Sequence, residues 1–100
     1  MNTNYFVFIY KPGPNWLPNK PITAQPLAGH FHYMSQLEAA AQLVVGGGFT
    51  DGSGAMGVIH MPNLAQAEAL IANDPVVKDE IVTATVHPWY VTVAGTIEKS

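Results

Sequence analysis

Apolar residues follow a period of two near both ends of the chain, which is the pattern of β-strands. Residues 4–10 are aromatic or β-branched at nearly every position, and residues 81–94 alternate in a similar way over a longer stretch. A third run of this kind covers Ala55–Met61. Such runs favour strands because branched and aromatic side chains pack well on a pleated surface. Pro88, which cannot donate a ladder hydrogen bond, indicates a bulge or an edge position in the last strand.

Between the first two strands the apolar period changes to that of a helix. One stripe with spacings of three and four predicts a helix from Pro26 to Val44, followed by a break at Gly46–Gly48 and a short strand around Phe49. The members of the stripe are Leu27, His30, Met34, Leu37, Ala41 and Val44.

A second helix is predicted to end at Ala72. Asn63 and Gln66 have the spacing of a capping box, which marks its start. Asp74 and Pro75 then suit the N-cap and the first position of a further helical turn, because proline disfavours helical geometry at the residue before it.

These elements occur in the order β-α-β-β-α-β, which is the ferredoxin-like, or split βαβ, arrangement. We therefore predict a single α+β domain over residues 1–100, with a four-stranded antiparallel sheet and two helices on one face. The segment 11–26 contains five prolines. It is predicted to be a long, stiff loop, and such loops are often functional.

The first and last strands carry apolar side chains on both faces, although two helices cover only one face. In the first strand Tyr5, Val7 and Ile9 alternate with Phe6, Phe8 and Tyr10. A sheet with one wet face would instead alternate apolar and polar residues. Charged residues make up only 11% of the chain, against about 25% in a typical domain. We therefore expect a symmetric homodimer that packs sheet to sheet.

The charge and cysteine content excludes several classes of function. The net charge is −3 and the four basic residues are all unclustered lysines, so no nucleic-acid partner is expected. The sequence has no cysteine, which excludes disulfides, thiol nucleophiles and thiolate metal sites. We see neither a signal peptide nor a run of about 20 apolar residues, so we expect a cytoplasmic protein without membrane contact.

His30 is the most informative of the titratable residues. It lies on the apolar stripe of the first helix, whereas His32 points the opposite way, so the pair lacks the spacing of helical metal ligands and no metal site is expected. His30 is either a hydrogen-bonded core residue or a general acid or base. The second role needs an orienting carboxylate. Asp74 is the best acidic candidate, although an N-cap role alone also explains it.

Four segments resemble the YciI-like (YCII-related) family of small dimeric αβ-barrel proteins. They are His30 with Gly47-Gly48 further along, Gly54-Ala-Met-Gly-Val-Ile59, Ala69-Leu-Ile-Ala-Asn-Asp-Pro-Val76 and Val86-His-Pro-Trp89. The resemblance implies a ferredoxin-like, dimeric fold with a His–Asp pair near a cleft, which the matching motifs carry onto His30 and Asp74. One branch of the family is linked to dehydrochlorination of a chlorinated hydroxyhydroquinone, whereas most members have no assigned reaction.

Two hypotheses of function follow. In the first, the protein is an enzyme of the lyase or isomerase type in which His30, oriented by Asp74, moves a proton on a small cyclic or aromatic substrate. Because aromatic walls suit an apolar ring, the residues expected to bind that substrate are Trp89, Tyr5, Tyr10, Trp16 and Met34. In the second, the protein is a non-catalytic dimeric binding module with a structural His–Asp hydrogen bond. No cofactor is expected, and haem binding through His30 is a third, less favoured possibility.

Overall fold

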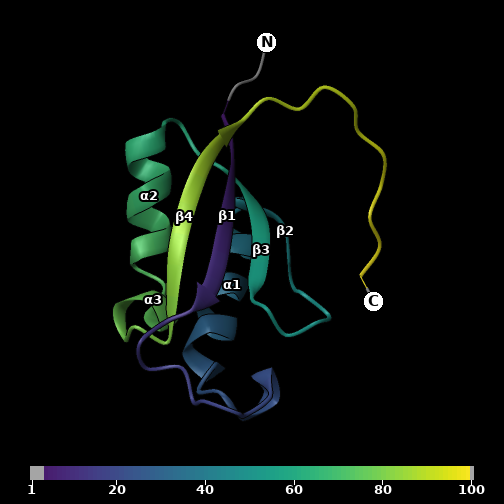
Figure 1. Ribbon diagram of the computed structural model, residues 1–100. Helices are drawn as coiled ribbons and strands as arrows, with labels where there is room; N and C mark the ends of the chain where they lie inside the picture. The colour runs from purple at the N-terminus through teal and green to yellow at the C-terminus, as the bar shows by residue number, and fades with distance from the viewer. Residues whose placement is uncertain (1–3, 100) are drawn as a thin grey trace.

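The computed structural model describes residues 4–99, in which the chain forms a four-stranded sheet and three α-helices. The strands are β1 (Tyr5–Pro12), β2 (Leu43–Gly48), β3 (Ala55–His60) and β4 (Val82–Trp89); the α-helices are α1 (Ala28–Ala39), α2 (Leu64–Ala72) and α3 (Pro75–Lys78), and a 3-10 helix, η1, covers Ile22–Ala24. The strands pair antiparallel in the order β2-β3-β1-β4 (Figure 1). This confirms the predicted ferredoxin-like βαββαβ arrangement, with α3 as the additional turn after α2.

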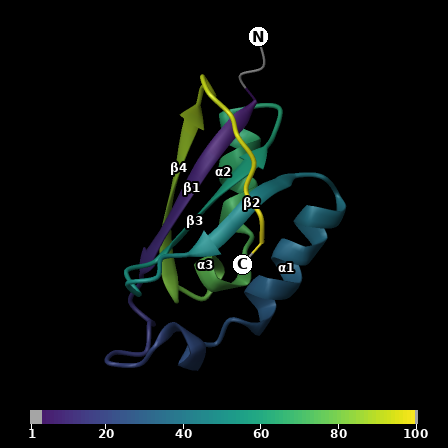
Figure 2. The ribbon, with the colours of Figure 1, turned by 90° about the vertical axis from the view of Figure 1, so that its right-hand side faces the viewer.

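The α-helices all lie on one face of the sheet. Figure 2 shows the sheet close to edge-on with α1, α2 and α3 to one side of it, and Figure 1 views the opposite face, which these helices leave uncovered. In the described part of the chain, none of the helices has the length and apolar character needed to cross a membrane.

The core lies between the sheet and the helices, and alternation along β1 builds much of it. Phe6, Phe8 and Tyr10 are buried on the helix side, whereas the residues between them are only half-buried on the other face. Gly57 is opposite Phe8 in the β1–β3 register. A Cβ at Gly57 would lie 2.3 Å from Cζ of Phe8, so this glycine makes room for the ring.

The first helix ends at Ala39 and does not reach Val44, as the apolar stripe predicted. The backbone turns at Ala41, which has a φ of 58°, and the N–H groups of Ala41 and Gln42 bond back to carbonyls of the last helical turn at 3.0 and 2.9 Å. This pair of bonds is the Schellman motif that closes many helices, usually with glycine in the left-handed position. Val44 consequently lies on β2 with an exposed side chain.

Gly46–Gly48 belong to β2 and are not a break before it. The short strand expected around Phe49 is β2, which lies earlier in the sequence and pairs with β3 only as far as Gly48. The Phe49 N–H instead bonds to the Gly54 carbonyl at 2.8 Å and closes the turn between the two strands. Cross-strand pairing thus outweighs the poor strand propensity of glycine.

The last strand is shorter than the predicted range 81–94. It ends at Trp89, which pairs with Tyr5, the first residue of β1. The residues beyond Trp89 therefore have no β1 residues beside them with which to extend the ladder. Pro88 does lie on an edge strand, as its missing N–H predicted.

We predict that Ala41→Gly raises the free energy of unfolding by about 0.5–1 kcal/mol, because glycine adopts a left-handed backbone without the steric cost that a Cβ imposes. Ala39→Gly, in the last helical residue of α1, is the matched control and lowers the free energy of unfolding by a similar amount. Chemical denaturation of both variants measures the two effects. Changes of the same sign in the two variants would contradict this account of the helix end.

Candidate active site

Asp74 lies between α2 and α3 and caps the second of these helices. Its Oδ1 accepts the Val76 N–H at 3.2 Å, and Pro75 occupies the first helical position, which confirms the predicted N-cap. The side chain is also completely buried. Burying a charge is costly unless hydrogen-bond donors compensate it, and the cap accounts for only one of the two carboxylate oxygens.

His30 supplies a donor to the other oxygen from the first turn of α1. Its Nδ1 lies 2.7 Å from Asp74 Oδ2, and the imidazole is 17% exposed. Helices α1 and α3 approach closely at this point, since a Cβ added to Gly29 would lie only 3.2 Å from Cβ of Pro75. The structure therefore brings together the two residues that the sequence nominated as a pair.

Tyr10, on β1, supplies a second donor to the same oxygen. Its hydroxyl donates to Asp74 Oδ2 at 2.7 Å. Burial, and then the charge of Asp74 and the hydrogen bond to it, raise the pKa of Tyr10 far above its usual value of 10.0. Burial and the Asp74 charge also raise the pKa of Tyr33, but the Tyr33 hydroxyl donates elsewhere, to the Leu70 carbonyl at 2.7 Å.

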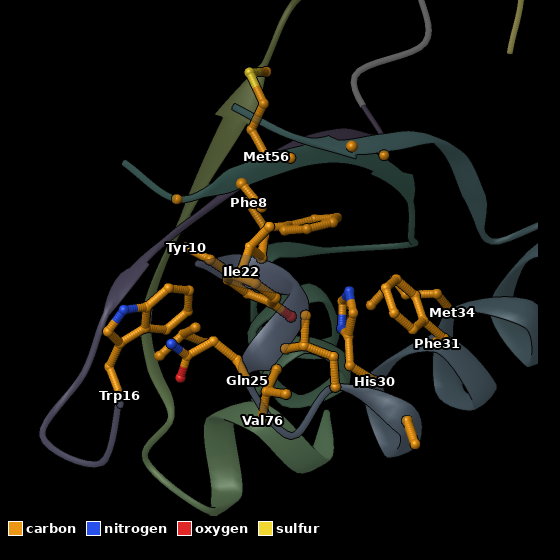
Figure 3. A pocket seen from close by; sticks show the side chains of 18 of the residues that line it. Phe8, Tyr10, Trp16, Ile22, Gln25, His30, Phe31, Met34, Met56 and Val76 are labelled. Carbon is orange, nitrogen blue, oxygen red and sulfur yellow. The ribbon is translucent and has the colours of Figure 1, made fainter. Parts of the chain in front are cut away.

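The hydrogen bonds assign the two ring nitrogens of His30. Because a carboxylate accepts hydrogen bonds, the neutral ring carries its proton on Nδ1, facing Asp74. Nε2 is then the unprotonated nitrogen. The ring stands at the edge of a cavity, near Tyr10 and on the same side as Phe31 and Met34 (Figure 3). A carboxylate on one nitrogen and an open space before the ring is the arrangement of a general base.

The cavity in front of His30 has a volume of about 720 Å³, within the range of small-molecule sites. Its residues come from β1, the proline-rich loop, α1, the β2–β3 hairpin, α3 and the start of β4. Figure 3 shows their side chains converging from these elements. Among the described lining residues the titratable ones are His30 and Tyr10, and none is a lysine or an arginine.

The proline-rich loop forms one wall of this cavity, and Gln25 holds the loop in shape. Oε1 of this buried glutamine accepts the Leu17 N–H at 2.8 Å, and Nε2 donates to the Leu17 carbonyl at 3.0 Å. These bonds join the two halves of the loop. They fix Trp16 and Ile22, which both line the cavity.

A second wall is formed by glycines of β2. Gly46 and Gly48 line the cavity and lie opposite Gly57 and Ala55 in the register. A Cβ added to Gly48 would first meet the Ile22 side chain, at 3.5 Å. The glycines therefore leave peptide backbone facing a space that larger side chains would partly fill.

Three of the five residues predicted to contact a substrate line the cavity, namely Tyr10, Trp16 and Met34. Tyr5 and Trp89 are not among the lining residues. They pair with each other in the β1–β4 register on the sheet face turned away from the helices, because side chains alternate along a strand and Tyr10 points inward.

Several lining residues were not identified from the sequence. Phe8 lies on the same face of β1 as Tyr10, so alternation alone would have found it. Gln25 and Ile22 offered no such signal, because the loop has no period. The bond between Tyr10 and Asp74 was also unexpected, since it joins residues 64 positions apart.

Comparison with known proteins finds a matching family model and a solved structure with a similar fold. A family model described as the YCII-related domain matches residues 5–90, whereas no curated protein matches the chain. Among solved structures, the chain is similar to the 5-chloro-2-hydroxyhydroquinone dehydrochlorinase TftG from Burkholderia phenoliruptrix, in a complex with 2,5-dihydroxybenzoquinone. The identity is 22% and the TM-score 0.66, over 86% of this chain and 93% of that chain.

The structural similarity confirms the predicted fold class. The family match extends from the first residue of β1 past the last residue of β4, so it includes the whole sheet, the helices and both His30 and Asp74. The chain therefore belongs to the family of YCII-related domains.

Proposed function

We propose that the protein is an enzyme of the lyase or isomerase type in which His30 transfers a proton on a small cyclic substrate. The observation that carries this proposal is the 2.7 Å contact between His30 Nδ1 and Asp74 Oδ2 beside a largely apolar cavity. Asp74 orients the ring so that Nε2 serves the bound molecule, and its charge stabilises the imidazolium that forms when Nε2 takes a proton.

The cavity lining favours an uncharged, mostly apolar ring as the substrate. Aromatic side chains of Phe8, Trp16 and Phe31 contribute to its walls, and such walls suit ring stacking. No cationic side chain among the described lining residues is available to hold an anion. TftG, whose bound molecule is 2,5-dihydroxybenzoquinone, supports a small cyclic ligand.

The proposed chemistry moves one proton at a time. In an elimination, Nε2 of His30 takes a proton from the substrate, the electrons of the broken bond form a new double bond, and the leaving group departs with its own electron pair. In an isomerisation, the same nitrogen returns the proton to a different atom of the substrate. Asp74 keeps its negative charge in both cases and holds the imidazolium in place.

The alternative is a non-catalytic module that binds a small molecule. It is favoured by the complete satisfaction of Asp74, whose three hydrogen bonds join β1, α1 and α3. Such a network stabilises the fold whether or not a proton is transferred. Proton exchange on a bound ligand separates the two functions.

We predict that His30→Gln abolishes proton transfer and leaves the fold intact. The assays are release of chloride from 5-chloro-2-hydroxyhydroquinone and exchange of C–H protons for solvent deuterium in a panel of neutral cyclic phenols and enols, followed by NMR. Loss of the general base lowers the rate by about 100-fold or more. His32→Gln, an exposed change on the same helix, is the matched control and keeps the wild-type rate.

Equal rates for His30→Gln and the wild type would contradict the role given to His30. The binding-module alternative is supported if the wild type binds 2,5-dihydroxybenzoquinone but moves no proton on any compound of the panel. Quenching of Trp16 fluorescence in a Trp89→Phe background reports binding, since only Trp16 of these two lines the cavity.

We further propose that the uncovered sheet face packs on a second copy of the chain. Met56 and Trp89 are exposed there, and Tyr5, Val7 and Ile9 are half-buried on the same face. The polar residues His60, His87 and Thr85 lie beside them in the register, and exposed apolar side chains bordered by polar ones mark interaction sites. A second copy supplies the matching apolar surface through a two-fold axis, as the alternation on both faces of β1 led us to expect.

We predict that Met56→Lys weakens this dimer, because a charge placed between the two sheets loses its hydration on association. Light scattering then gives a mass close to the 10.7 kDa of one chain, where the wild type gives about twice that mass. Leu64→Lys on α2 is the control, since Leu64 is 38% exposed and Met56 39%. A monomeric wild type, or equal weakening by both changes, would contradict the proposed interface.

A further inference from the structure

We propose that Tyr10 is a positioning residue of the His30–Asp74 pair, whose hydroxyl holds the shared carboxylate oxygen and sets the pH at which His30 takes up its second proton. From the sequence, the Tyr10 ring is expected only in the wall of the site. The functional meaning of this inference rests on the proposed role of His30. Its test concerns the pair itself and needs no substrate.

The geometry that carries the inference is the convergence of two donors on one oxygen. The Tyr10 hydroxyl and His30 Nδ1 each lie 2.7 Å from Asp74 Oδ2, while the Val76 N–H holds Oδ1 at 3.2 Å. The two rings meet edge to face with their centroids 5.9 Å apart. Donors from three elements therefore fix the carboxylate, and Tyr10 is the only one of them that comes from the sheet.

Sharing one acceptor makes the two side-chain donors compete. The neutral hydroxyl of Tyr10 compensates part of the negative charge on Oδ2. The compensated part of the charge is then not available to stabilise a positive charge on His30. Without the hydroxyl, more of the carboxylate charge acts on the imidazolium. The protonated form of His30 then persists to higher pH, and a stronger donor at Tyr10 has the opposite effect.

Few other titratable groups face His30. Of the elements packed around it, β1 contributes Tyr10 and α1 contributes Tyr33, whose hydroxyl is bonded to Leu70. α3 contributes Lys78, which is exposed and does not line the cavity, and neither β2 nor the lining part of the loop contributes any. Burial and the nearby Asp74 raise the pKa of Tyr10, so its phenol remains a donor while His30 titrates.

The test compares Tyr10→Phe with Tyr33→Phe in the intact, unliganded chain. NMR of the ¹⁵N-labelled imidazoles follows the pH midpoint at which the His30 ring protonates. Tyr10→Phe is expected to raise this midpoint by about 0.5–1 pH unit, the effect of removing one hydrogen bond to the compensating charge. Tyr33→Phe also removes a tyrosine hydroxyl, but one that does not contact Asp74, and it leaves the midpoint unchanged.

A second variant keeps the fold and the hydrogen bond and is expected to shift the His30 midpoint in the opposite direction. Site-specific replacement of Tyr10 by 3-fluorotyrosine makes the phenol a stronger donor, so the His30 midpoint falls below that of the wild type. If Tyr10→Phe does not fold, this variant decides alone. An unchanged midpoint, shifts in the directions opposite to these, or an equal shift in Tyr33→Phe would show that Tyr10 only packs against the pair, and the inference would be overturned.

Stability at high pH gives a separate prediction for the buried Tyr10 hydroxyl. The pKa of Tyr10 in the folded chain is raised above 10.0, so above pH 10 the folded state retains a proton that the unfolded state releases. The contribution is complete below pH 10 and is lost as the pH rises, at up to about tenfold in the unfolding equilibrium constant per pH unit. Tyr10→Phe lacks this contribution and loses stability less steeply above pH 10. Equal slopes in denaturation experiments would contradict the raised pKa of Tyr10.

These outcomes are separable from those of the proposed function. If His30→Gln retained full activity while Tyr10→Phe still moved the His30 midpoint, proton transfer by His30 would fail and the coupling within the pair would stand. If instead His30→Gln were inactive and the midpoint did not respond to Tyr10, the proposed function would stand without this positioning residue.

Discussion

A carboxylate that is cut off from water needs hydrogen-bond donors inside the protein, because the loss of its hydration otherwise costs a large share of the net stability of a small domain. Asp74 finds these donors on β1, α1 and α3. That solution requires α1 to approach α3 closely, which Gly29 permits, and it requires a hydroxyl on the inner face of β1. The position of His30 at the cavity is thus a consequence of how one buried charge is compensated.

The architecture was predictable because it depends on periods that extend over several residues. Alternation along the first strand identified its buried side, and the change to a period of three and four identified the helices. The end of α1 was not predictable in the same way. It depends on the left-handed backbone of Ala41, where no glycine or proline marks the turn, and the apolar residues beyond it continued the helical spacing by coincidence. The glycines of β2 likewise suggested a break, and only their pairing with β3 makes them a strand.

The candidate site was predictable where local chemistry restricted the choice. Few acidic residues had apolar neighbours, so Asp74 stood out, and the helical period placed His30 on an inner face. Contacts between distant segments were beyond such reasoning, and the hydroxyl of Tyr10 on Asp74 is the clearest case. The predicted contacts of Tyr5 and Tyr10 with one substrate conflicted with the alternation itself, because an odd separation places them on opposite faces of the strand. Trp89 pairs with Tyr5 in the register and therefore also lies on the face opposite Tyr10.

The scarcity of charged residues affects both the outer face of the sheet and the protonation of the His30–Asp74 pair. Only 11% of the residues are charged, and none of the described lining residues is a lysine or an arginine. A guanidinium or ammonium group beside Asp74 would take up most of the carboxylate charge and leave His30 only weakly coupled to it. In the absence of such a group from the lining, compensation falls to the Val76 N–H, the Tyr10 hydroxyl and the His30 imidazole. The same scarcity of charge that leaves mainly uncharged side chains on the outer face of the sheet therefore makes the protonation of His30 sensitive to a single neutral hydroxyl on β1.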